Sequence, residues 1–154
     1  MEENVYATVT AANTAIVKWI NGDGPDTDAG FAGLRAVCHP DLSIVHPRGS
    51  HQDHGALLSD LRGAHDMNRD FRIATPREHA RLLHEDTNTV VAEFIELQAG
   101  SKAVGRPRHA RRITVICLKD ETAPHGLVIW RLHESFVPAD EESDFDWSPL
   151  EAAT

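Results

Sequence analysis

Three histidines, His46, His51 and His54, stand within nine positions of the segment IVHPRGSHQDHG (residues 44–55). Imidazole side chains bind transition metals, and they exchange protons near neutral pH. The segment therefore indicates one of three structures: a metal site, the mouth of a catalytic pocket, or a strand that ends in a turn before a helix.

The residues before the first of these histidines alternate as in a short strand. Leu42, Ile44 and His46 share one face, and Pro47 and Gly49 end the strand. His46 should therefore point toward the core and line a pocket, where it could act as an acid or a base. The alternative is a buried histidine that only hydrogen-bonds the backbone at the junction with the next helix.

The other two histidines stand at the expected start of that helix. Ser50 and Asp53 have the spacing of a capping box, and three leucines follow at helical spacing. Zinc needs three or four ligands that converge at about 2.0–2.3 Å. The turn separates His46 from His51 and His54, and no cysteine or glutamate stands in a convincing fourth position. A metal site is therefore the weakest interpretation, and we expect none.

A further histidine, His133, lies in the last apolar segment, GLVIWRLHESFV (126–137). Strict alternation puts it on one face with Arg131 and Ser135, and the opposite face is more apolar. If the polar face points inward, it offers a cation, an acid or base, and a hydroxyl in one row. If it points outward, it forms a polar surface for a dimer.

Carboxylates are the other candidate acid–base groups, because burial raises the pKa of a carboxyl toward neutrality. Glu93 and Glu96 fall on opposite faces of the segment VVAEFIELQ, and Arg111 and Arg112 fall on opposite faces of the next strand. One glutamate and one arginine could form an internal pair. A cross-strand salt bridge on the outer face of the sheet is the alternative.

The elements that must position these residues are helices first and strands afterwards. Residues 4–21 and a segment from about Asp28 carry apolar residues at helical spacing, and the helix after Ser50 is the third. From residue 71 onward, β-branched and aromatic segments alternate with turn signals, as in a strand meander. The segment REHARLLHE (77–85) suits a strand or a helical turn. This order predicts an α+β fold rather than α/β.

The chain of 154 residues is 41% hydrophobic and 25% charged, which suits one globular domain. No apolar run is long enough for a membrane span, and the acidic start, MEENVYATVT, is unlike a signal peptide, so we expect a cytoplasmic protein. Cys38 and Cys117 stand alone in apolar contexts, and we expect both to be free thiols.

Negative charge is concentrated at the end of the chain. From Ala139 onward there are six acidic residues and no lysine or arginine, and in the rest of the chain 18 acids face 15 basic residues. We therefore divide the chain into a domain (1–138) and an acidic C-terminal tail (139–154), solvated or loosely docked, which Trp147 could anchor to the domain or to a partner subunit. This charge balance makes nucleic acid a poor partner.

Two stretches resemble the nuclear transport factor 2-like superfamily. HPDLSIVHPRGSHQDHGALLSDL (39–61) is similar to its short strand, turn and helix. GLVIWRLHESFVP (126–138) is similar to its last strand, in which a tryptophan precedes an alternation that ends in H-x-S. The second stretch is particularly similar to the SnoaL-like and calcium/calmodulin-dependent kinase II association-domain branches. The resemblance covers about residues 4–138.

The resemblance implies a curved antiparallel sheet that forms a cone against three N-terminal helices, and a homodimer through the outer face of the sheet. The helices would close the wide end of the cone over a pocket for a small apolar or amphipathic molecule. We expect six side chains around this pocket: Tyr6, Trp19, His46, Phe94, Arg112 and His133. Isomerase-like members carry a carboxylate at the end of the strand 42–47, where this chain has His46 and Pro47. This departure argues against ketosteroid-isomerase chemistry.

Three functions are consistent with these features. The first is a cofactor-independent isomerase, dehydratase or cyclase that uses His46 and His133 for acid–base catalysis. The second is a domain that binds a ligand or assembles with itself without catalysis. The third is a histidine metal site. The first two functions need no cofactor, and none of the three functions needs a membrane.

Overall fold

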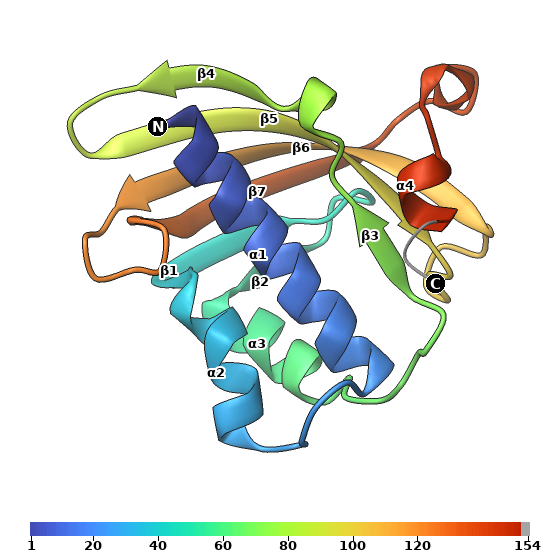
Figure 1. The fold of residues 1–154 in the computed structure, drawn as a ribbon, viewed down its shortest axis with the longest axis horizontal. Helices are drawn as coiled ribbons and strands as arrows, with labels where there is room; N and C mark the ends of the chain where they lie inside the picture. Colours follow the sequence, from blue (N-terminus) through green and yellow to red (C-terminus); the bar gives the residue numbers. More distant parts are fainter. Residues whose placement is uncertain (152–154) are drawn as a thin grey trace.

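The first helix, α1 (Glu2–Asn21), lies across one face of a single curved sheet (Figure 1). The structure is a computed structural model and describes residues 1–151. The helix turns one side toward the sheet because buried residues recur at helical spacing: Val5, Val9, Ala12 and Trp19. It ends at Gly22, whose φ of 80° is the left-handed conformation that glycine adopts without a Cβ clash.

Two shorter helices, α2 (Asp28–Ala36) and α3 (His54–Arg62), lie below α1 in the view of Figure 1. The α3 helix begins at a side-chain cap, since Asp53 Oδ1 accepts a hydrogen bond from the backbone amide of Ala56 at 2.8 Å. The expected capping box that starts at Ser50 is wrong, because residues 51–53 form a short strand, β2 (His51–Asp53), and Asp53 itself is the N-cap.

Within residues 1–151 the sheet has seven strands in the order β2-β1-β7-β6-β5-β3, and β4 also pairs with β5. The strands other than β2 are β1 (Cys38–Val45), β3 (Arg72–Ala74), β4 (Arg81–Glu85), β5 (Thr89–Ala99), β6 (Arg108–Lys119) and β7 (Leu127–Phe136). Every pair is antiparallel except β1 with β7, which is parallel.

The predicted α+β fold, with three helices packed on a curved sheet, is confirmed. The sheet is mixed rather than wholly antiparallel, because β1 returns beside the last strand of the chain. The segment 77–85 contains both of its expected structures, since a short 3₁₀ helix, η1 (Arg77–His79), leads into β4.

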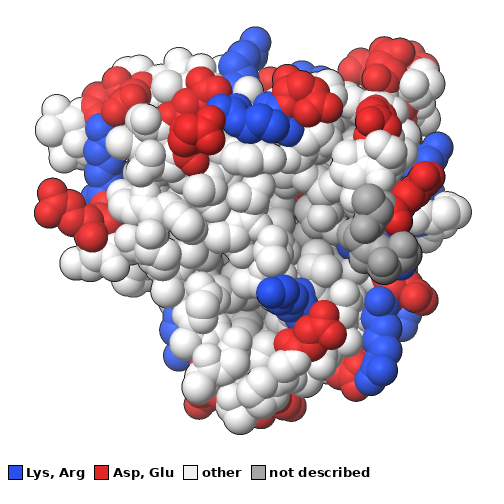
Figure 2. All heavy atoms as spheres, viewed as in Figure 1, with Lys and Arg blue, Asp and Glu red and all other residues white. Residues whose placement is uncertain are grey.

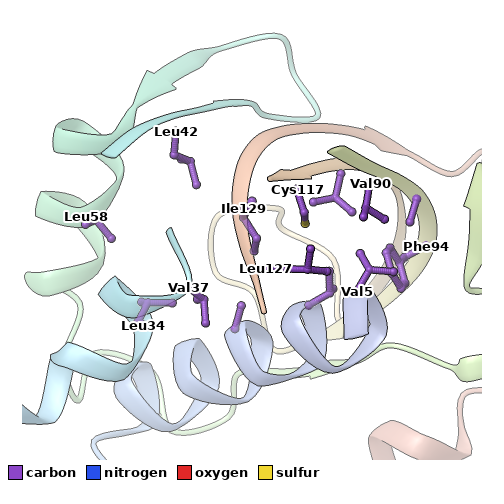
Figure 3. Close-up of a cluster of buried hydrophobic side chains, with 14 of the residues drawn as sticks. Val5, Leu34, Val37, Leu42, Leu58, Val90, Phe94, Cys117, Leu127 and Ile129 are labelled. Atoms are coloured by element: carbon purple, nitrogen blue, oxygen red, sulfur yellow. The ribbon is translucent and has the colours of Figure 1, made fainter. Parts of the chain in front are cut away.

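The main hydrophobic core lies between α1 and the inner face of the sheet (Figure 3). Val5 of α1 packs with Phe94 of β5 and Leu127 of β7, and all three side chains are buried. Figure 3 also shows the core extending toward α2 and α3 through Leu34, Val37, Leu42 and Leu58. Since side chains alternate along a strand, Phe94 places Glu96 and Gln98 on this same inner face.

The C-terminal segment packs on the outer face of the sheet through η2 (Glu142–Asp144) and α4 (Ser148–Glu151). A second apolar cluster holds it there, made by Ile95, Leu97, Ala110, Val137 and Leu150, with Phe145 and Trp147 packed against it. Glu142 also accepts a hydrogen bond from the backbone amide of Ala110 at 2.9 Å. The described part of the expected acidic tail is thus docked, with Trp147 as one anchor, and residues 152–154 of that tail lie outside the described residues.

The surface over α1 carries little charge. Figure 2 shows an uncharged band there, with acidic and basic side chains interspersed around it. This face therefore offers no extended field of one sign for a polyanion. No helix within residues 1–151 is both long enough and apolar enough to cross a membrane.

Candidate functional site

A cavity of about 220 Å³ lies between the three helices and the inner face of the sheet. Most of its wall is apolar and includes Ile16, Leu34, Ile44, Leu61, Ile113 and Leu132. Its polar side chains include Asn13, His46, Glu96, Gln98, Arg111 and Glu134, which we call the polar wall. An apolar cavity with a few converging polar groups is typical of a small-molecule site.

Strand pairing explains why the carboxylates and the guanidinium of the polar wall meet. Glu96 of β5 is paired with Arg111 of β6, and side chains at paired positions lie on the same face of a sheet. On the next strand, Glu134 of β7 is paired with Ile113, two residues along from Arg111. All of these side chains therefore point inward, toward the cavity.

Glu96 is a carboxyl that the protein encloses, with 4% of its surface exposed. Its Oε2 accepts a hydrogen bond from Asn13 Nδ2 at 3.0 Å, and its Oε1 accepts one from Gln98 Nε2. Burial and then the negative charge of Glu134 raise the pKa of Glu96 to about 7, although the hydrogen bonds and Arg111 oppose this rise. Both protonation states of Glu96 are therefore populated at neutral pH, as a general acid or base requires.

Arg111 supplies the cation of the polar wall. Its Nη1 donates to Glu134 Oε2 at 2.9 Å, and its Nε donates to His109 Nε2 at 3.0 Å. Burial and the charges of Arg111 and Arg106 lower the pKa of His109 to about 4, so this imidazole is neutral and can accept the bond. Two buried side-chain atoms among the described residues have no hydrogen-bond partner, Gln98 Oε1 and His109 Nδ1.

His46 reaches the polar wall through the parallel pairing of β1 with β7. Val45 pairs with His133, so the residues that follow them, His46 and Glu134, come together. His46 Nδ1 lies 3.8 Å from Glu134 Oε2, and His46 Nε2 lies 2.8 Å from Gln52 Oε1. The nearby Glu134 carboxylate is the largest influence and raises the pKa of His46, while burial acts in the opposite direction. The His46 side chain is 29% exposed, so it lies at the edge of the cavity.

Of the six side chains expected around the pocket, His46 lines the cavity. Three others belong to the hydrophobic core or pack against it instead: Tyr6, Trp19 and Phe94. The Tyr6 hydroxyl donates to the carbonyl of Thr75 at 2.9 Å, and Trp19 Nε1 donates to the carbonyl of Leu61 at 2.7 Å. The polar ends of these two rings thus tie α1 to neighbouring segments and do not face the cavity.

The expected inward orientation of His133 is wrong, because the more apolar alternate set of β7, with Leu132 and Glu134, faces the cavity and His133 belongs to the opposite set. Residues 116 and 117 of β6 pair with residues 131 and 129 of β7, which leaves Trp130 as an extra residue. This β-bulge puts Ile129 on the inner face with Glu134, while His133 is exposed on the outer face. The inward alternative for Arg131 and Ser135 is wrong as well, because both residues share the outer face with His133.

Arg112 is likewise exposed on the outer face, and its expected place in the pocket is wrong. Its guanidinium lies 3.9 Å from Glu93 and 3.8 Å from Glu141. The outer alternative therefore occurs, as the salt bridge between Glu93 and Arg112. Arg111 forms its internal ion pair with Glu134, although its paired position on β5 is Glu96.

Glu134 is the member of the polar wall that the sequence pattern did not single out. It stands in an alternate set of β7 that is otherwise apolar, with Leu132 before it and Phe136 after it. A single carboxylate on the more apolar side of a strand is the signal that could have identified it, because that side usually faces the interior.

The structure gives the histidine metal interpretation no support. Within residues 1–151, no group of three or more His, Cys, Asp or Glu side chains is arranged to hold a metal ion. His51 lies in β2 and is exposed, and His54 is the first residue of α3. Only His46 of the three contributes to the cavity.

Comparison with known proteins identifies the fold. Neither a protein-family model nor a curated protein sequence matches the chain. A nuclear transport factor 2-like protein of unknown function from Pseudomonas aeruginosa matches 88% of this chain and 99% of its own, at 24% identity and a TM-score of 0.75. The chain has the nuclear transport factor 2-like fold.

Other structures of this fold have quite different names. The hub of the calcium/calmodulin-dependent kinase II of S. rosetta matches 84% of this chain and 95% of its own, at 13% identity and a TM-score of 0.62. A ketosteroid isomerase-like protein from Erwinia carotovora atroseptica matches 90% and 94%, at 13% identity and a TM-score of 0.56. The nuclear transport factor 2-like fold alone therefore does not determine function, and the SnoaL-like branch stays a prediction.

Proposed function

We propose that the protein is a cofactor-independent isomerase or lyase that moves a proton within a small, mainly apolar substrate bound in the cavity. The observation that carries this proposal is Glu96, a carboxyl enclosed in the cavity wall whose pKa is raised to about 7. Carboxylates in such surroundings serve as general bases at neutral pH. Glu96 therefore replaces His133 as the partner of His46 in the acid–base chemistry predicted from the sequence.

The polar wall can supply both halves of a proton transfer. Ionised Glu96 takes a proton from a carbon next to a carbonyl, and the electron pair left behind moves onto the carbonyl oxygen. Arg111 and protonated His46 stabilise that negative charge from the same wall. Return of the proton to a different carbon completes an isomerisation, and departure of a protonated hydroxyl group completes a dehydration.

The cavity sets the size and polarity of the substrate. Its volume of about 220 Å³ lies below the range of about 300–1,000 Å³ typical of drug-sized ligands. The apolar wall suits a compact hydrocarbon body, and the polar wall suits one functional group at a single end. Gln98 Oε1 is a buried acceptor without a partner among the described residues, so it can accept a hydrogen bond from a hydroxyl of the substrate.

Hydrogen–deuterium exchange at carbon tests this proposal without knowledge of the true substrate. A panel of small cyclic and branched ketones and β-hydroxyketones is incubated with the protein in D₂O, and NMR follows deuterium incorporation next to the carbonyl. We expect exchange of at least one compound, and a loss of about 10²-fold or more in Glu96→Gln. Glu93→Gln on the outer face is the matched control and should retain the rate. No exchange across the panel, or equal rates in wild type and Glu96→Gln, would contradict the proposal.

A second candidate function is assembly through the outer face of the sheet, as a homodimer. It draws support from the matched structures that are named as a kinase hub and as an association domain. The C-terminal segment covers the outer face near Leu97 and Ala110, so a dimer would use the part of that face that carries His133. Light scattering should give twice the 17.0 kDa chain mass, and a monomer at micromolar concentration would contradict this candidate.

A further inference from the structure

A series of side-chain contacts leads from the surface of α3 to the polar wall. Asp60 Oδ2 accepts a hydrogen bond from Gln52 Nε2 at 2.5 Å. Gln52 Oε1 lies 2.8 Å from His46 Nε2, and His46 Nδ1 lies 3.8 Å from Glu134 Oε2. Asp60 is exposed, Gln52 is half-buried, and Glu134 is buried, so this series of contacts leads from solvent to the cavity.

The backbone brings Gln52 to the correct side of the sheet. Gln52 of β2 is paired with Ile44 of β1, and Ile44 lines the cavity. Paired side chains share a face, so Gln52 lies beside His46, the residue two positions after Ile44. The backbone of His46 is also fixed, because its amide donates to the carbonyl of Ser50 and its carbonyl accepts from the amide of Gly49, both at 2.8 Å.

The hydrogen-bond donors and acceptors of Asp60, Gln52 and His46 have only one consistent arrangement. An ionised carboxylate accepts hydrogen bonds and cannot donate them, so the amide group of Gln52 must turn its nitrogen toward Asp60. The amide oxygen of Gln52 then faces His46, and an amide oxygen also only accepts. His46 Nε2 must therefore carry the hydrogen, which leaves Nδ1 as the nitrogen that faces Glu134.

We propose that Gln52 and Asp60 are positioning residues that hold His46 in the Nε2–H tautomer, so that Nδ1 is the atom through which His46 accepts or gives a proton. This role in proton transfer rests on the proposed function, whereas the tautomer itself does not. The charged groups around the imidazole are Glu134 of β7, Arg111 of β6 and, beyond Gln52, Asp60 of α3. Glu134 favours the protonated ring, and Arg111 disfavours it.

NMR of uniformly ¹⁵N-labelled protein tests the proposal directly, because the ¹⁵N shifts of the two ring nitrogens distinguish the tautomers. His46 signals are assigned by their loss in His46→Asn and are followed from pH 5 to pH 9. In the wild type we expect the Nε2–H tautomer alone above the pKa of His46. In Gln52→Leu we expect mixed tautomers and a lower pKa of His46, because the bond to Gln52 contributes to raising that pKa.

Asp60→Asn tests whether the orientation of the Gln52 amide, and not merely its presence beside His46, fixes the tautomer. An asparagine at 60 can accept or donate, so the Gln52 amide is free to turn over and present its nitrogen to His46. The tautomers of His46 should then mix, although Gln52 is still present. Since Asp60 is exposed and asparagine has nearly the same shape, this variant should fold even if Gln52→Leu does not.

Asp53→Asn is the matched control, because it also removes one negative charge beside α3. Asparagine is as good an N-cap as aspartate, so the helix keeps its first turn and His46 should behave as in the wild type. An Nδ1–H tautomer in the wild type, or an unchanged tautomer and pKa in Asp60→Asn, would overturn the proposal. These outcomes do not depend on deuterium exchange, so the proposed function can fail while the positioning role holds, and the reverse.

Discussion

Replacing Glu96 by glutamine should change how the stability of the protein depends on pH. In the folded protein the pKa of Glu96 is raised from its ordinary value of 4.5 to about 7. The folded state therefore binds this proton more tightly than the unfolded chain does. Stabilisation from the protonated carboxyl is complete below about pH 4.5 and is lost as the pH rises through about 7.

The size of the effect follows from the two pKa values. A difference of about 2.5 corresponds to about 3 kcal/mol in the free energy of unfolding. Glutamine has nearly the shape of the protonated carboxyl but does not titrate. The variant should match the wild type near pH 4.5 and exceed its free energy of unfolding by about 3 kcal/mol at pH 8. His46 and His109 titrate in both proteins, so their contributions largely cancel in the difference.

Urea unfolding between pH 4.5 and pH 8 provides the assay, with Glu93→Gln as the control. The control removes a glutamate from the outer face of the same strand, so its curve should run parallel to that of the wild type. Parallel curves for Glu96→Gln and the wild type would refute the reasoning, because they would mean that Glu96 has the same pKa in the folded and unfolded states.

Three further predictions concern the stability and reactivity of the fold. Arg111→Met should lower the free energy of unfolding by about 3–5 kcal/mol at pH 7, because it leaves the buried Glu134 without its cation. Arg112→Met on the exposed face should lower it by about 1 kcal/mol or less. Urea unfolding of both variants measures the difference. Leu150→Ala should cost about 2–5 kcal/mol and make the C-terminal segment susceptible to limited proteolysis, and an unchanged digestion pattern would contradict the docking described above. The pKa of Cys117 is raised to about 12 by burial, so mass spectrometry should detect no alkylation by iodoacetamide at pH 8 in the native protein and complete alkylation in urea.

The sequence predicted the side of the strand on which His46 lies because β1 is regular between Leu42 and Val45. Alternation alone then suffices to place a side chain. Alternation also grouped His133 correctly with Arg131 and Ser135, but this polar set was expected to face inward although the opposite set is more apolar. The unpaired Trp130 changes only the face of the residues before it, such as Ile129, and a bulge has no signature in a single sequence. Glu134 belongs to that more apolar set, so its inward position depends on the same choice of face.

Other parts of the site depend on contacts between distant segments. Alternation could show that one of Glu93 and Glu96 points inward, yet only the packing of α1, which brings Asn13 to Glu96, determines which one. The parallel pairing of β1 with β7 joins residues some 90 positions apart, so the approach of His46 to Glu134 could not be derived from local pattern. The short strand β2, which carries Gln52, has too few residues for a periodic signal.

Titration of Glu96 by ¹³C NMR tests the central claim most directly, because the chemical shift of its carboxyl carbon reports the protonation state of that one group. The signal is assigned by its absence in Glu96→Gln. A midpoint near pH 7 is the result that a proton-transfer site in this cavity predicts. A midpoint near the ordinary value of 4.5 would contradict it, since Glu96 would then be almost wholly ionised at neutral pH and the enclosed, raised-pKa carboxyl on which the proposal depends would not exist.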